Sequence, residues 1–338
     1  MKILLSSTTL KTIGLVISVI IFFISFLLSI ALGKTPIPFQ LVYDAIFNYD
    51  ESITEHVIIT TSRMSRAVIA CVIGASLAIA GALMQALTRN PLAAPDIFGI
   101  NAGALFFVVF SATFLSVESL VSYMWIAFLG AAVAGALVYF LGSLGRDGLS
   151  PIKIVLAGAA ITALFVSFTQ GLLVIDEQGI QSVLFWLAGS VAGRSMDMLL
   201  PVLPFMLLSI VIALFLGRAI NILITGEDIA KGLGQNTILV KLLIGIIVVF
   251  LAGGSVAVAG SIGFIGLMVP HMVRGLVGTD YRWVIPYSAI VGGSILLLAD
   301  IAARFILMPE EMPIGVMTAI LGTPFFIYIA RRGITKND

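Results

Sequence analysis

Long apolar stretches separated by short polar connections run through the chain from residue 13 to residue 329. A helix needs about 20 predominantly apolar residues to cross a hydrocarbon core of roughly 30 Å. Ten segments approach that length: residues 13–32, 67–87, 97–115, 120–141, 152–174, 199–216, 239–258, 262–276, 283–301 and 314–329. The first is too long for the apolar core of a cleaved signal peptide, so we expect it to be retained. The pattern predicts an all-α polytopic membrane protein with about ten transmembrane helices.

Basic residues orient these helices. If both termini lie in the cytoplasm, five of the 18 Lys and Arg residues fall in outer connections, and the other thirteen fall in cytoplasmic ones. The five are Lys34, Arg63, Arg66, Arg194 and Arg304. Because cytoplasmic connections of membrane proteins carry an excess of Lys and Arg, this asymmetry predicts cytoplasmic N and C termini.

Composition narrows the class of protein. Of the 338 residues, 60% are apolar and 10% are charged, which excludes a water-soluble fold. The net charge of +1 gives no general attraction to nucleic acid. One cysteine and two histidines cannot build a disulfide framework, a Cys/His zinc site or an iron–sulfur cluster. We therefore expect no cofactor and no metal centre.

The connections are too short to hold a soluble domain. The largest are residues 33–62, 175–198 and a cytoplasmic connection at about 218–238, so residues 1–338 are expected to form a single membrane domain. The sequence lacks the Gly-x-x-x-x-Gly-Lys-Ser/Thr loop that cradles nucleotide phosphates. If ATP drives this protein, another subunit must hydrolyse it.

Two predicted spans lead into irregular segments. Gly74, Ala78 and Ala82 repeat every four residues, which leaves one helical face open to close approach by another helix. Asn90-Pro91 and Pro95 then break the helix, so the segment lines a cavity or forms a surface turn, and the residues do not decide between these. The glycine-rich run at 259–274 also predicts a broken or reoriented element.

Charged groups mark both faces of the membrane. Glu227 and Asp228 suit the first turn of a short cytoplasmic helix that Gly232 or Gly234 ends, and the residues alone favour an ordinary amphipathic loop helix. At the outer face, Asp300 stands four residues before Arg304, where it can orient the guanidinium. The other outer arginines, in Ser-Arg-Met-Ser-Arg at 62–66, suit either lipid phosphates or acidic side chains of a docking protein.

Four segments together resemble a known family, the ten-helix permease subunits of ATP-binding-cassette importers for iron-siderophore complexes, haem and vitamin B12. They are residues 85–99 with Arg-Asn-Pro-Leu-Ala, 226–234, 264–271 reading Phe-Ile-Gly-Leu-Met-Val-Pro-His, and 315–326. The resemblance covers nearly the whole chain. It implies a location in the bacterial cell membrane and a second permease subunit, identical or paralogous. It also implies two cytoplasmic ATPase subunits and an extracytoplasmic substrate-binding protein.

The resemblance also assigns roles to residues. The helix that fits a cleft on the ATPase would comprise Gly226, Glu227, Asp228, Ile229, Ala230, Gly232, Leu233 and Gly234. Docking of the binding protein would fall to Arg63, Arg66 and Arg304. The translocation pathway and its gate would use Asn90, Leu92, Thr162, Thr169 and Gln170.

The function that these expectations describe is import by alternating access, without covalent chemistry in the permease. Iron-siderophore complexes are the expected cargo, with haem or vitamin B12 as alternatives. A secondary transporter driven by ions would need ionisable residues at the bilayer midplane, and Asp300 is the single clear candidate in the sequence. A membrane-embedded enzyme would need a nucleophile with its base or a metal cluster, and the sequence displays neither.

Overall fold

The computed structural model describes residues 4–33, 37–115, 117, 119–144, 150–175 and 188–334, and the regular elements within them are all helical. In chain order these are α1 (Thr8–Ala31), α2 (Phe39–Phe47), α3 (Thr54–Val57), the π-helical turn η1 (Ile58–Arg63), α4 (Met64–Thr88), the 3-10 turn η2 (Pro95–Phe98), α5 (Ile100–Phe114), α6 (Leu120–Ser143), α7 (Pro151–Ile175), α9 (Met196–Leu199), α10 (Leu203–Ile224), α11 (Glu227–Gly232), α12 (Thr237–Ala259), α13 (Ile265–Val277), α14 (Tyr281–Ile306) and α15 (Ile314–Ile334). The predicted all-α class is confirmed.

Seven helices in the described part of the chain are long and apolar enough to cross a membrane. They are α1, α6, α7, α10, α12, α14 and the continuous helix of 35 residues made by α3, η1 and α4. The predicted spans 97–115 and 262–276 coincide with shorter apolar helices, α5 with 15 residues and α13 with 13. The predicted span 314–329 coincides with the apolar stretch Ile314–Ile329 of α15. The expectation of about ten transmembrane helices therefore stays a prediction, since seven of the described helices have the length of a full span. The turn η2 and the irregular residues before α13 interrupt the chain, which delays the start of α5 and α13.

Several predicted boundaries also shift. The second span begins at Thr54 rather than residue 67, so Arg63 and Arg66 lie within a helix instead of at its mouth. The connection expected at 33–62 contains α2, which the sequence pattern did not predict. Helix α10 continues to Ile224, so the connection expected at 218–238 shortens to the residues between α10 and α12.

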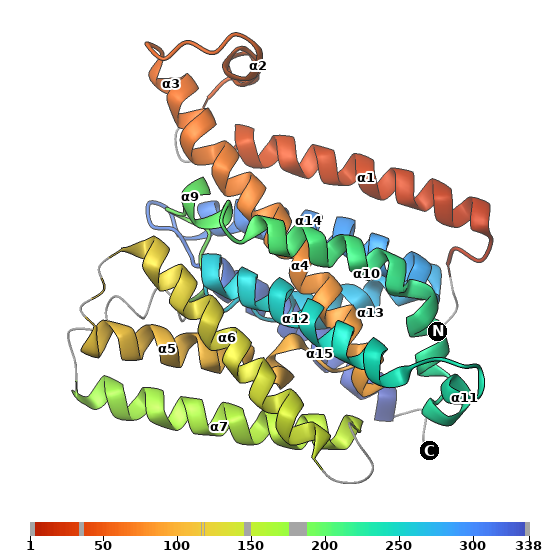
Figure 1. Ribbon diagram of the computed structural model, residues 1–338. Coiled ribbons are helices and arrows are strands. Elements are labelled where there is room, and N and C mark those ends of the chain that lie inside the picture. The colour runs from red at the N-terminus through yellow and green to blue at the C-terminus, as the bar shows by residue number, and fades with distance from the viewer. Residues whose placement is uncertain are drawn as a thin grey trace.

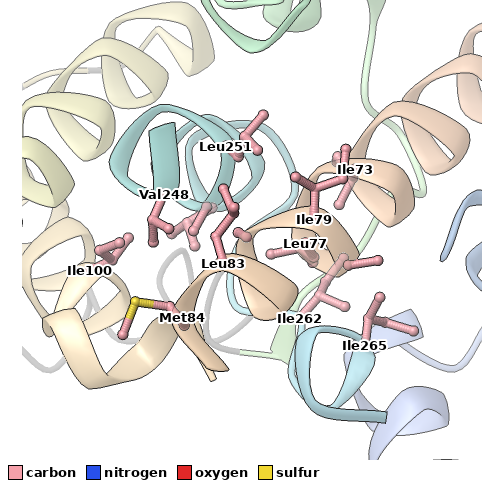
Figure 2. Packing of buried hydrophobic residues seen from close by; sticks show 14 of the residues in the cluster. Ile73, Leu77, Ile79, Leu83, Met84, Ile100, Val248, Leu251, Ile262 and Ile265 are labelled. Atoms are coloured by element: carbon pink, nitrogen blue, oxygen red, sulfur yellow. The ribbon is translucent and has the colours of Figure 1, made fainter. Parts of the chain in front are cut away.

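Helices α4 and α12 form the centre of the bundle. In their most apolar 18-residue windows, 78% of the α4 segment and 72% of the α12 segment are buried, against 17% for α1 and 28% for α7. Figure 1 places α1 and α7 at opposite edges of the molecule, with α4 and α12 between them. Figure 2 shows Leu83 and Met84 of α4 packed toward Val248 of α12. The apolar faces of α1 and α7 are consequently available to lipid or to another chain.

Small residues let α4 and α14 approach closely, as the repeat at 74–82 predicts. A Cβ on Gly74 would lie 2.4 Å from the Gly292 carbonyl oxygen, and a Cβ on Gly292 would lie 2.4 Å from the Gly74 carbonyl oxygen. No side chain fits between the two backbones at this crossing. The predicted close approach of helices is therefore confirmed.

The bundle has two ends that carry different charged groups. One end holds α11 and, in Figure 1, the start of α1 and the end of α15; we call it the α11 end. The other holds α2, α3, α9 and the buried residue Asp300 near the end of α14, and we call it the Asp300 end.

Candidate functional site

Helix α11 is a short capped helix, as predicted from its sequence. Gly226 precedes it with φ of +137°, a conformation that glycine adopts easily, and the helix ends at Gly232. Ala230 is completely buried, which holds the helix against the bundle. Glu227 reaches α12, where Lys241 Nζ lies 2.6 Å from its carboxylate, and Lys231 Nζ lies 3.2 Å from the same group.

These contacts lower the pKa of Glu227. Partial burial alone would raise the pKa, but hydrogen bonds from Lys241 and Lys231 outweigh it, so the carboxylate stays ionised. Glu227 therefore ties the start of α11 to α12. The Glu227 side chain points toward the bundle, whereas Asp228, the next residue, is exposed.

The opposite face of α11 points away from the bundle. Asp228 is exposed, and the apolar side chains of Ile229 and Leu233 are 56% and 68% exposed. Gly234, with φ of +81°, then turns the chain toward α12. Two large apolar side chains beside an exposed carboxylate form a compact protruding surface that this chain leaves uncovered.

A second charged group lies at the α11 end, where α14 begins. Asp280 caps this helix, and its carboxylate accepts hydrogen bonds from Arg282 and, at 2.6 Å, from the Asn221 amide of α10. The hydrogen bond from Arg282 is the main reason that the pKa of Asp280 falls to about 2.

The chain breaks after α4, as the Asn-Pro pair predicts. Arg89 takes a left-handed conformation with φ of +51°, and the Asn90 side chain accepts a hydrogen bond of 2.9 Å from the Leu92 amide. Leu92 is 37% exposed. The Arg89 guanidinium donates to the Leu223 carbonyl oxygen at 3.1 Å, near the end of α10. This bond joins the broken segment to the helix that leads into α11.

Gln85 fixes the same segment from the other side. Its amide donates to the carbonyl oxygens of Ala93 at 3.2 Å and of Gly266, in α13, at 3.3 Å, and its oxygen accepts from Arg274. Gln85 is 4% exposed, so these bonds satisfy a buried amide. Sequence reasoning missed the roles of Gln85, Arg89 and Arg274, since their partners lie far away along the chain.

The three α7 residues expected in the pathway do not share one environment. Gln170 is exposed and Thr162 is half-buried. Thr169 is 4% exposed, and its hydroxyl donates to the Phe165 carbonyl oxygen at 2.8 Å. On this chain, Thr169 therefore faces inward, and Gln170 lies on the open face of the helix.

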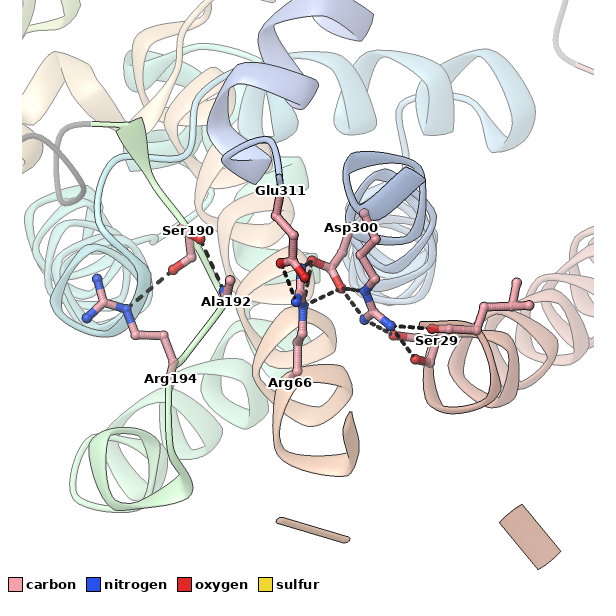
Figure 3. A network of polar contacts seen from close by, with 9 residues as sticks. Ser29, Arg66, Ser190, Ala192, Arg194, Asp300 and Glu311 are labelled. Carbon is pink, nitrogen blue, oxygen red and sulfur yellow. Dashed lines mark hydrogen bonds and ion pairs between the residues drawn. The ribbon is translucent and has the colours of Figure 1, made fainter. Parts of the chain in front are cut away.

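Buried ion pairs occupy the Asp300 end. Arg66 donates to both Asp300 oxygens, at 2.8 and 3.0 Å, and to Glu311 at 2.8 Å. Arg304 also binds Asp300, which confirms the predicted pairing of these two residues, and it reaches the Ser29 carbonyl oxygen of α1 at 2.7 Å. The Asp300 side chain has no exposed surface (Figure 3).

Arg63 joins α1 to the same end. Its guanidinium donates to the carbonyl oxygens of Ile30 at 3.1 Å and Ala31 at 2.7 Å. Of the three expected docking residues, Arg63 and Arg304 are 6% and 3% exposed, and the Arg66 side chain is 14% exposed. The network holds α1, α4 and α14 together, and Arg66 is the most exposed of its three arginines.

Sequence reasoning also missed a polar group between the two ends. Asp96, in η2, accepts a hydrogen bond of 2.5 Å from the Asn101 amide, which also donates to Ser261 Oγ at 3.1 Å. Asp96 is exposed on the isolated chain. The sequence did contain a signal for this residue, since Asp96 follows the helix-breaking Pro91 and Pro95. Irregular backbone within a membrane lines a cavity or packs inside protein, so a carboxylate placed there is a candidate functional residue.

Metal-ligating residues do not gather in the described segments. No group of three or more His, Cys, Asp or Glu residues that could hold a metal ion occurs there.

Comparison with known proteins finds one matching family model and relatives that align over nearly the whole chain. A model of the FecCD transport family matches residues 21–332. The chain is 54% identical to a Bacillus subtilis (strain 168) protein named a probable siderophore transport system permease protein, YfiZ, over 96% of this chain and 97% of the relative. It is 44% identical to the Fe(3+)-citrate import system permease protein YfmD of the same organism, over 94% of each chain.

A solved structure shares the fold. It is described as a metal-chelate type ABC transporter in an inward-facing conformation, with a TM-score of 0.83 and 29% sequence identity. The alignment covers 94% of this chain and 98% of that one.

Proposed function

This chain belongs to the FecCD transport family, and from that premise we propose that it is the membrane permease of an ATP-driven importer for iron-siderophore complexes. It is a multi-pass protein of the cell membrane, with long apolar helices and relatives that are transport permeases. The permease itself does no covalent chemistry; separate ATPase subunits hydrolyse ATP. The observation that carries the proposal is the full-length match to permeases named for siderophore and ferric citrate transport.

The proposed topology has ten membrane helices and one domain over residues 1–338. The seven long helices cross the membrane fully, while α5, α13 and α15 supply the other three and begin within its depth. Both termini and α11 face the cytoplasm, and the Asp300 end faces outward. The excess of basic residues in the connections at the α11 end supports this orientation.

Helix α11, in the connection at about 218–238, couples the permease to an ATPase. Its residues divide by what they touch. Ile229 and Leu233 are exposed apolar side chains that suit insertion into a cleft on the ATPase, and Asp228 suits a basic partner at the rim. Glu227 and Ala230 anchor the helix to the bundle, and the glycines at 226, 232 and 234 shape its ends.

Arg63, Arg66 and Arg304 form the proposed docking region for an extracytoplasmic binding protein. Arg66 would meet an acidic side chain of that protein, since it is the most exposed of the three. Arg63 and Arg304 would support it by fixing α1 and α14 around the site. Glu311 already contacts Arg66, so docking would exchange one carboxylate partner for another.

A second permease subunit, identical or paralogous, would pack beside α7, and the pathway would run between the two copies. The open face of α7 carries Gln170 among large exposed apolar residues. Thr162 lies at the edge of this face, and Thr169 supports the helix from behind. Asn90 and Leu92, exposed after the end of α4, would form the cytoplasmic gate.

The contacts suggest how motion passes from ATPase to gate. ATP binding would shift α11, whose preceding helix α10 holds Arg89 through the Leu223 carbonyl oxygen. Arg89 directly precedes the gate residue Asn90. A displacement of α10 would therefore pull on the gate segment, while Gln85 keeps that segment attached to α13.

The test is to isolate the intact complex from its native membrane and identify the subunits and the bound ligand by mass spectrometry. We expect a second permease subunit, two ATPase subunits and an iron complex. Haem or vitamin B12 in place of an iron-siderophore complex would correct the cargo. Uptake by the reconstituted chain without any ATPase would contradict the proposal and favour an ion-driven transporter.

The coupling role needs its own variant. Ile229→Asp places a charge in the proposed apolar contact and should abolish co-purification of the ATPase, because burying an unpaired carboxylate is costly. Lys231→Ala, on the same helix, is the matched control and should leave the complex intact. Equal recovery of the ATPase with both variants would eliminate the proposed contact.

A further inference from the structure

Asp96 lies within the membrane and not at either of its surfaces. Helix α7 has 25 residues and is therefore about 37 Å long. The turn η2 crosses α7 at Gly158, where a Cβ would lie 1.7 Å from the Ile97 carbonyl oxygen. Gly158 is about 10 Å along α7 from its start, and Thr162, which contacts Gly99, is about 16 Å along it. With α7 centred on a hydrocarbon core of about 30 Å, Gly158 lies about 7 Å inside that core, and Asp96 is on the turn that crosses it there.

Two interrupted elements meet at this place. Helix α5 begins only at Ile100, directly after η2, and α13 begins at Ile265 after the irregular residues 260–264. Asn101 of the first element donates to Ser261 of the second at 3.1 Å, and to Asp96 at 2.5 Å. Paired interruptions of membrane helices generally mark substrate sites, since their freed backbone groups line a cavity.

The exposure of Asp96 limits what can surround it. Its side chain is exposed on the isolated chain, although Asn101 holds one carboxylate oxygen. A carboxylate facing lipid inside the hydrocarbon core is unfavourable. A water-filled pathway removes most of that cost, and the neighbouring residue Thr162 lies at the edge of the open face of α7.

We propose that Asp96, positioned by Asn101 and Ser261, is an acidic substrate-binding site inside the translocation pathway. The inference rests on the proposed function and deepens it. The site would take a positively charged or N–H-donating group at the periphery of an iron complex, such as a protonated amine. It would disfavour strongly anionic complexes, ferric citrate among them, because like charges repel in a low-dielectric passage.

Thiol labelling tests whether Asp96 faces water. Cys71 is the only cysteine of this chain, so Cys71→Ser leaves the chain without a native thiol, and labelling is read on this chain after separation from its partners. In the reconstituted full complex, Asp96→Cys should react with charged, membrane-impermeant methanethiosulfonates. Ile20→Cys, in the middle of α1 and 52% exposed on the isolated chain, is the lipid-facing control and should not react. If the thiol introduced by Asp96→Cys stays unreactive both with and without ATP, the proposal is overturned.

The charge of the site is measured separately. In the same background, Asn101→Cys places a thiol beside Asp96. Its rate ratio for cationic over anionic methanethiosulfonate should fall about tenfold when Asp96→Asn is added, since the carboxylate attracts the cation. An unchanged ratio would contradict an electrostatic role for Asp96.

Uptake measurements then test the Asp96 site separately from the proposed cargo. The probes are a ferric trihydroxamate with a free primary amine and its N-acetylated form, which have the same metal coordination. Asp96→Asn should slow uptake of the amine form several-fold relative to the acetylated form, and equal slowing would count against the site. Uptake of neither probe by the unmodified complex would count against the proposed iron-siderophore cargo, while the two thiol measurements decide the Asp96 site independently.

Discussion

The two ends of helix α14 each carry an aspartate, and their surroundings are opposite. Asp300 has no exposed side-chain surface and binds two arginines, one of them from a helix 234 residues earlier in the chain. Asp280 is partly exposed, and its arginine partner is only two residues away with a side chain that is 57% exposed. The Asp300 carboxylate joins α14 to α4 through buried arginines, whereas the Asp280 carboxylate caps α14 and accepts a hydrogen bond from α10 at an exposed position.

The difference shows how charge serves two purposes in one membrane protein. A buried ion pair is destabilising to break, because it leaves an uncompensated charge in a low dielectric. An exposed pair contributes little and can exchange partners at low cost. The Asp300 end is consequently held together by ion pairs that are costly to break, whereas Glu227 and Lys231 at the α11 end are partly exposed, which suits the proposed contact of α11 with an ATPase.

The largest effect should come from Asp300→Ala. This change leaves Arg66 and Arg304 buried without their shared carboxylate and should lower the free energy of unfolding by about 3–5 kcal/mol. Thermal unfolding in detergent, followed by intrinsic fluorescence, measures it. Asp280→Ala at the other end of the same helix is the matched control. Similar losses for both variants would remove the contrast between the two ends.

Glu227→Arg should affect function far more than stability. It replaces the partner of Lys241 and Lys231 with a third cation, which turns α11 away from α12. We expect uptake to be abolished, while membrane insertion persists and the loss of stability stays near 1 kcal/mol. Iron uptake and the melting temperature are measured on the same preparation. Normal uptake would refute the coupling role of α11.

Arg89→Gln should have an intermediate effect. The variant loses the hydrogen bond to the Leu223 carbonyl oxygen, and a bond from a charged donor contributes about 1.5–3 kcal/mol at most. We expect uptake to slow several-fold while ATP hydrolysis continues, because the gate segment no longer follows α10. Arg282→Gln, a cation on an exposed surface at the same end, is the control. An unchanged ratio of uptake to hydrolysis would refute the connection.

The smallest effect concerns pH and Asp280. The pKa of this group is about 2 in the folded protein, below its ordinary value of 3.8. Its contribution to stability is therefore complete above about pH 4 and disappears as the pH falls toward 2. Asp280→Asn should lower the melting temperature by about 1 °C or less at pH 7, with a smaller difference at pH 3. A difference that grows on acidification would contradict this assignment.

The sequence predicted those features that depend on residues close together along the chain. The short helix α11 follows from acidic residues at its start and glycines at its ends, and the Asp300–Arg304 pair follows from a spacing of four. The break after α4 follows from Asn90-Pro91. In each case the interacting groups are neighbours along the chain.

The sequence pattern could not predict contacts between helices that are far apart along the chain. Nothing near Arg66 indicates that its carboxylates come from α14 and the residues after it, and nothing near Asp96 indicates that α13 supplies Ser261. The pattern also placed the starts of α5 and α13 too early, because apolar residues continue through turns where the backbone is irregular. Hydrophobicity reports depth in the membrane, whereas the end of a helix depends on backbone geometry.

The unbroken rod formed by α3, η1 and α4 has a mechanical consequence. Its 35 residues span about 50 Å, so it is longer than the lipid bilayer is thick. Arg63 and Arg66 lie toward one tip, the segment at Asn90 leaves the other, and the Gly74–Gly292 crossing stands between them. A slight tilt of this rod about the glycine crossing would move its two tips in opposite directions, so a displacement at Asn90 and one at the Asp300 end would occur together.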